Sequence, residues 1–184
     1  MAVDTKTPAI RFKGFTNAWE QRKLSEVVCR VSVMSDEIGL PRVEYEDINS
    51  GQGTLNKNIY EKNSTKQGVL FHENDVLFGK LRPYLKNWLL AGFSGIAVGD
   101  FWVLRGDETD SGFVYSLIQS SAFDEVANQS SGTKMPRSDW NLVSNTVFSI
   151  PHSKGEQHQI GTFFIHLDSL ITLHQRKLKK LQNG

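Results

Sequence analysis

The sequence contains only one cysteine and no long apolar run. Because Cys29 is the single cysteine among 184 residues, an internal disulfide is excluded and a zinc site would have one thiolate at most. No stretch approaches the roughly 18 consecutive apolar residues that a membrane-spanning helix needs. The first twelve residues carry charges and lack the apolar segment of a secretory signal peptide. We therefore expect a cytoplasmic protein without a membrane partner.

Sequence motifs that carry catalysis or bind cofactors are also missing. The sequence has no P-loop and no G-x-S-x-G elbow, and Gly51-Gln52-Gly53 lacks the third glycine of a dinucleotide-binding fingerprint. No two histidines stand four residues apart, as in a helical zinc site. Arg82-Pro83-Tyr84 lacks the residues that precede Pro-Tyr in DNA adenine methyltransferases. We expect no catalytic residue, no metal site and no cofactor in this chain.

Charge is balanced overall but unevenly distributed. The 21 basic and 20 acidic residues give a net charge of +1, so any argument for nucleic-acid binding must come from local charge. Residues 154–184 carry five basic and two acidic side chains, and the rest of the chain is slightly acidic. We expect two units: a near-neutral domain at residues 1–152 and a basic tail at residues 153–184.

The first unit is predicted to be a compact mixed α/β (α+β) domain with a mixed β-sheet and short helices. Short segments rich in β-branched and aromatic residues, bounded by Gly, Asn or Asp, predict strands at 43–48, 76–78, 88–91, 101–104 and 146–150. Apolar residues at helical spacing predict a helix over 112–127 and a shorter one over 24–30.

The tail predicts one long C-terminal helix with an apolar seam. Spacings that alternate between four and three residues relate Ile160, Phe164, Leu167, Ile171, His174, Leu178 and Leu181. These are the a and d positions of heptads, and a lone polar member such as His174 usually sets register or is simply tolerated. A helix over 155–182 would be about 42 Å long, with a possible capping box between Ser153 and Glu156. We expect it to bury this seam against a partner helix; packing along its own domain is the alternative.

The first local concentration of positive charge lies between Asp75 and Asp100. This window contains no acidic residue but holds Lys80, Arg82, Tyr84 and Lys86. In an extended chain these four residues point to one side, and Pro83 favours an extended conformation for Arg82. Such a row suits phosphates and base edges. A solvated strand face with acidic side chains nearby is the alternative.

A second window without acidic residues runs from 126 to 138. Gly132 and Pro136 indicate a loop, and Lys134, Arg137 and Ser138 can contact bases or phosphates. Loops on a rigid domain often carry recognition, although an ordinary surface loop has a similar composition. The second window supports nucleic-acid binding only together with the first.

Several segments together resemble a known family. They are Pro8 to Leu24, Glu73 to Tyr84, Ser131 to Trp140, Ile150-Pro151, Glu156-Gln157, Ile160 and Leu167-Asp168. In their order and spacing the chain resembles the specificity subunit of type I restriction–modification systems, with one target-recognition domain and its following conserved helix. The resemblance is weakest over 31–67, where such domains vary.

The resemblance implies a non-catalytic subunit that reads double-stranded DNA. Complete members look like two recognition domains joined by two long antiparallel helices, each domain reading half of a split site. This chain would be an N-terminal half or a natural half-subunit, pairing through its helix with a second copy or a second half. Partner methyltransferase and restriction subunits would hold the methyl donor, magnesium and ATP. A stand-alone DNA-modifying enzyme and a protein-interaction adaptor remain alternatives.

Overall fold

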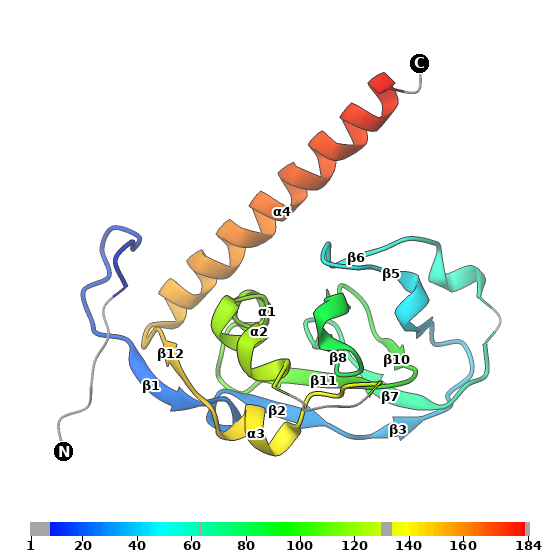
Figure 1. The fold of residues 1–184 in the computed structure, drawn as a ribbon, viewed down its shortest axis with the longest axis horizontal. Helices are drawn as coiled ribbons and strands as arrows, with labels where there is room; N and C mark the ends of the chain where they lie inside the picture. Colours follow the sequence, from blue (N-terminus) through cyan, green and yellow to red (C-terminus); the bar gives the residue numbers. More distant parts are fainter. Residues whose placement is uncertain (1–7, 63, 130–133, 183–184) are drawn as a thin grey trace.

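The structure, a computed structural model, describes residues 8–62, 64–129 and 134–182. Strands and short helices form a mixed α+β body, and one long helix, α4 (Lys154–Gln182), extends away from it (Figure 1). The predicted fold class is therefore confirmed. Among the described residues, none of the helices combines the length and apolarity that a membrane crossing requires.

A four-stranded antiparallel sheet forms the centre of the body. Its order is β2 (Val28–Val31), β11 (Phe101–Gly106), β8 (Val76–Gly79) and β9 (Trp88–Leu90). Alternate residues of the middle strands face opposite ways, so Phe78 and Trp102 join one apolar cluster while Leu77 and Val103 join another. Both faces of this sheet are therefore buried, and its middle strands read as continuous apolar runs.

A second sheet covers one face of the central sheet. Its order is β3 (Met34–Ser35), β7 (Gly68–Phe71), β10 (Gly95–Ala97) and β4 (Arg42–Val43), with β10 and β4 parallel. The predicted strand 43–48 is wrong as one element. A 3₁₀ turn, η2 (Tyr45–Asp47), interrupts it, and β5 (Ile48–Asn49) then pairs with β6 (Thr54–Leu55). A further 3₁₀ turn, η3 (Ile59–Glu61), follows.

Short helices cover the other face of the central sheet. They are α1 (Ser111–Ile118), α2 (Ser121–Ala127) and α3 (Trp140–Asn145). The predicted helix 112–127 is divided, because the Ser120 hydroxyl accepts a hydrogen bond from the Phe123 amide and starts a new helix. The predicted helix 24–30 is wrong. A single 3₁₀ turn, η1 (Leu24–Glu26), leads into β2, whose β-branched residues favour extended backbone.

The base of α4 is tied to the amino-terminal segment. Strand β1 (Glu20–Lys23) pairs antiparallel with β12 (Val147–Ile150), the strand that precedes α4. The buried Glu156 carboxylate accepts hydrogen bonds from Arg11 Nε at 2.5 Å, Arg11 Nη2 at 2.7 Å and Trp19 Nε1 at 3.1 Å. Among the described residues no hydrogen bond joins Ser153 and Glu156, so the predicted capping box is not formed, and the carboxylate binds Arg11 and Trp19 instead.

Candidate nucleic-acid interface

The two basic windows lie side by side. Leu81 and Arg137 form an antiparallel bridge. The Arg82 amide donates to the Pro136 carbonyl at 2.7 Å, and the Ser138 amide donates to the Lys80 carbonyl at 2.8 Å. Residues 80–86 and 134–138 therefore form one surface, which we call the basic loop pair.

The first window is not extended, so the predicted row of alternating side chains is wrong. Arg82 has left-handed backbone with a φ of 49°, Pro83–Leu85 forms the 3₁₀ turn η4, and Lys86 has a φ of 56°. The chain must reverse here, because β8 and β9 are antiparallel and the Gly79 amide donates to the Asn87 carbonyl at 2.7 Å. Pro83 occupies the first position of the turn, where its fixed φ fits and no N–H is needed.

The tip of this hairpin carries positive charge and an aromatic ring at the surface. Arg82, Tyr84 and Lys86 are exposed, and so is Lys134 from the second window. Arg82, Lys86 and Lys134 form no ion pair with any residue that the structure describes. These cations are therefore available to a ligand.

Lys80 and Arg137 instead share one acidic residue. Lys80 Nζ lies 3.7 Å from Asp100 Oδ1, while Arg137 Nη2 and Nε lie 3.1 and 3.3 Å from Asp100 Oδ2. Neutralisation by nearby acids, the alternative considered from the sequence, thus applies to these two residues.

Ser138 faces the interior. Its side chain is buried, and its hydroxyl donates to the Ala127 carbonyl at 2.8 Å. This bond ties the second window to the end of α2. We therefore leave Ser138 out of the proposed DNA contacts and assign it the anchoring of this loop.

Tyr45 is a residue that sequence reasoning missed. Its hydroxyl donates to the Asp100 carbonyl and accepts from the Leu81 amide at 3.1 Å. Burial, reinforced by the Asp100 carboxylate, raises the pKa of Tyr45 above its ordinary value, so the phenol keeps its proton and can donate. Tyr45 thereby joins the basic loop pair to the turn before β11.

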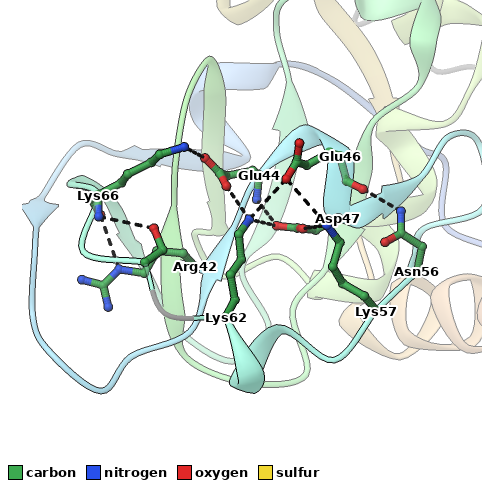
Figure 2. Close-up of polar contacts among 9 residues, drawn as sticks. Arg42, Glu44, Glu46, Asp47, Asn56, Lys57, Lys62 and Lys66 are labelled. Atoms are coloured by element: carbon green, nitrogen blue, oxygen red, sulfur yellow. Dashed lines mark hydrogen bonds and ion pairs between the residues drawn. The ribbon is translucent and has the colours of Figure 1, made fainter.

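An ion-pair cluster surrounds the turn that carries Tyr45 (Figure 2). Lys62 binds both Glu44 and the fully buried Asp47, where its Nζ lies 2.9 Å from Oδ2. Lys66 approaches the other Glu44 oxygen at 2.6 Å, and Lys57 Nζ lies 2.9 Å from Asp47 Oδ1. Hydrogen bonds from Lys62 and Lys66 hold the pKa of Glu44 below its ordinary value.

This cluster fixes the backbone of η2. The Glu44 amide donates to Asp47 Oδ2 at 2.8 Å, so the carboxylate that binds Lys62 also closes the turn. All of these residues lie within 31–67, where the resemblance to a known family is weakest. A signal existed in the sequence, since Glu44, Glu46 and Asp47 precede Lys57, Lys62 and Lys66, but their pairing depends on the path of the intervening chain.

The apolar seam of α4 is largely open to solvent. Ile160 is half-buried against the body, whereas Phe164, Leu167, Ile171, His174, Leu178 and Leu181 are exposed, Leu181 to 78%. The face that meets α1 is different: Gly161 packs directly on the backbone of Gly112 and Phe113. From Leu173 to Gln182 every residue is exposed, and the end of the helix projects from the body (Figure 1).

Within 8–62, 64–129 and 134–182, no three His, Cys, Asp or Glu side chains are grouped so that they could hold a metal ion. The features that stand out chemically are thus the basic loop pair and the open seam.

Comparison with known proteins gives a consistent result. No family model matches the chain. The type I restriction enzyme EcoDI specificity subunit of Escherichia coli is 22% identical over 177 residues, which cover 91% of this chain and 39% of that protein. The crystal structure of the HsdS subunit from Thermoanaerobacter tengcongensis matches 96% of this chain and 47% of its own, with a TM-score of 0.64 and 24% identity. The chain has a type I specificity-subunit fold. The resemblance predicted from the sequence is thereby confirmed.

Two other solved structures from type I systems agree. A chain described under "Structural basis underlying complex assembly and conformational transition of the type I R-M system" matches 96% of this chain, with a TM-score of 0.67 and 19% identity. The S subunit of the type I restriction–modification system from M. genitalium matches 89%, with a TM-score of 0.60 and 15% identity. This chain spans less than half the length of each of these type I relatives.

Proposed function

We propose that the chain is a DNA sequence-recognition module of a type I restriction–modification complex, reading one half of a bipartite target. The observation that carries this proposal is the union of the two basic windows into one exposed surface on a specificity-subunit fold. The proposed contacts to double-stranded DNA are Lys80, Arg82, Tyr84, Lys86, Lys134 and Arg137.

Within this surface, Arg82 is the proposed base reader. Its guanidinium is exposed at the hairpin tip, and the fork of an arginine matches O6 and N7 of guanine in the major groove. Lys86 and Lys134 are better suited to phosphates, which position a protein without reading sequence. Tyr84 offers an exposed ring to bases or sugars.

The chain would perform no chemistry itself. In this proposal, methyltransferase and restriction subunits dock on the complex in the cytoplasm and supply the methyl donor, magnesium and ATP. The module decides where on the DNA they act. Incubating the purified chain with DNA and labelled methyl donor tests this part, because incorporation of label would make the chain a stand-alone enzyme.

Helix α4 would set the spacing between two such modules. With 29 residues it is about 44 Å long, somewhat more than the roughly 34 Å of one DNA turn. Its open seam suits a second helix, from another copy or from a second half of a longer subunit. Pairing two copies by a two-fold axis would present identical readers to a palindromic split site.

The DNA-binding proposal is tested by titrating duplex DNA with the chain across a salt series. We expect the logarithm of the binding constant to fall linearly with the logarithm of salt concentration, by about 0.9 per phosphate neutralised. Arg82→Ala is expected to lose about 1–3 kcal/mol on the preferred half-site and much less on other sequences. Lys13→Ala, an equal charge change at an exposed lysine of the amino-terminal segment, is the control. Binding that is absent, or unaffected by salt, would favour the protein-interaction adaptor.

A further inference from the structure

Asp100 occupies a central position beneath the basic loop pair. It follows Gly99, which has a φ of 102°, in the turn between β10 and β11. Each oxygen of its partly exposed carboxylate forms an ion pair with a different residue, Oδ1 with Lys80 and Oδ2 with Arg137. One negative charge is therefore shared between the two windows.

The backbone of Asp100 is held as well. Its carbonyl accepts hydrogen bonds from the Lys80 amide at 2.9 Å and from the Tyr45 hydroxyl. Because main chain and side chain are both engaged, the carboxylate has a defined position relative to the hairpin tip. Lys80 and Arg137 are consequently held in place before any ligand arrives.

A carboxylate in this position competes with DNA phosphates for the same cations. Lys80 and Arg137 can contact phosphates only by leaving or sharing Asp100, whose negative charge then repels the DNA backbone. Binding that relies on phosphate contacts alone is weakened by the whole of this competition and repulsion. A register that also uses base contacts at Arg82, which forms no ion pair with the described residues, has a compensating gain.

We propose that Asp100 is a specificity-determining residue that holds Lys80 and Arg137 in the free chain and weakens binding to non-target DNA. The inference rests on the proposed function, since it presumes that the basic loop pair meets DNA. It adds that the strength of non-specific binding is limited by an acidic residue of the chain.

The test compares Asp100→Asn with Glu73→Gln in binding to a mixed-sequence duplex. Both substitutions remove one negative charge, but Glu73 is exposed in the turn before β8, at the opposite end of that strand from Lys80, and pairs with no cation among the described residues. Asp100→Asn should tighten binding by about 2- to 30-fold, the range expected on releasing two surface ion pairs. The slope of the logarithm of the binding constant against the logarithm of salt concentration should become steeper by up to about 1.8, because two more cations can reach phosphates. Glu73→Gln should change both quantities little.

A second background excludes a general effect of misfolding or charge. When Lys80→Met and Arg137→Met are already present, Asp100→Asn should tighten binding no more than Glu73→Gln does. Equal effects of Asp100→Asn and Glu73→Gln in the otherwise unchanged chain would overturn the inference while leaving the proposed function intact. An unsubstituted chain that binds no duplex at low salt would overturn both.

Discussion

The crossing of α4 over α1 depends on two glycines that face each other. A Cβ atom on Gly161 would lie 2.5 Å from the carbonyl carbon of Gly112 and 2.7 Å from the amide nitrogen of Phe113. These are backbone atoms, so no side-chain rotation relieves the clash and the helices must separate by nearly 1 Å. Overpacking of this kind costs about 1–3 kcal/mol, and the better helix propensity of alanine returns at most about 1 kcal/mol. We expect Gly161→Ala to lower the free energy of unfolding by roughly 1–2 kcal/mol.

The same helix provides a matched control. At Gly155 an added Cβ would meet its nearest atom, Ser153 Oγ, at 3.4 Å, an ordinary contact distance. Gly155→Ala should therefore leave the free energy of unfolding unchanged or raise it by up to about 1 kcal/mol. Urea denaturation followed by tryptophan fluorescence measures both variants. If Gly161→Ala proves as stable as Gly155→Ala, the close helix crossing is refuted.

Other predictions concern the tyrosine anchor, the buried carboxylate and the seam. Tyr45→Phe removes two hydrogen bonds to main-chain groups and should lower the free energy of unfolding by about 1–3 kcal/mol in urea; no loss would contradict the anchoring role. Burial alone would raise the pKa of Glu156, but the hydrogen bonds led by Arg11 outweigh it and leave that pKa below its ordinary value. The stability that Glu156 contributes is thus present above its unfolded-state pKa and lost as the pH falls through its folded-state pKa. In urea denaturation at several acidic pH values, the free energy of unfolding should fall less with decreasing pH for Glu156→Gln than for the unsubstituted chain. An equal fall in both would contradict the assignment. Leu167→Asp with Ile171→Asp should yield a monomer in analytical ultracentrifugation; an unsubstituted chain that is already monomeric at high concentration would argue against the seam.

Elements with strong local periodicity were predictable from the sequence. Helix α4 was predicted within a residue of its observed start, because apolar residues repeat at heptad spacing over many turns. Strands β8, β9, β11 and β12 were found because short apolar runs with β-branched and aromatic residues are bounded by turn residues. In both cases the signal lies within one segment of the chain.

Features that depend on distant residues were not predictable. Leu24 to Arg30 was assigned to a helix, but pairing with β11 draws its second half into a sheet. Arg82 was expected to be extended because proline follows it, yet in the closed β8–β9 hairpin it has left-handed backbone. Local propensity gave way to tertiary pairing at each of these places.

Some features of the candidate interface were likewise predictable from local sequence, and others were not. Its basic residues were predictable, since a run without acidic side chains is visible in the sequence. The contributions of Tyr45 and Asp100 were not, because each meets the basic loop pair only after β-strands far apart in the chain have paired. The interior position of Ser138 likewise follows from its bond to the Ala127 carbonyl, which no local pattern indicates.

The central claim is that this chain reads DNA sequence through the basic loop pair. The most direct measurement is selection from a pool of random-sequence duplexes by the purified chain, followed by sequencing of the bound DNA. We expect enrichment of one short motif, and its loss or relaxation at a single base pair with Arg82→Ala. Bound DNA with no enriched motif, or the same motif with and without Arg82, would contradict the claim.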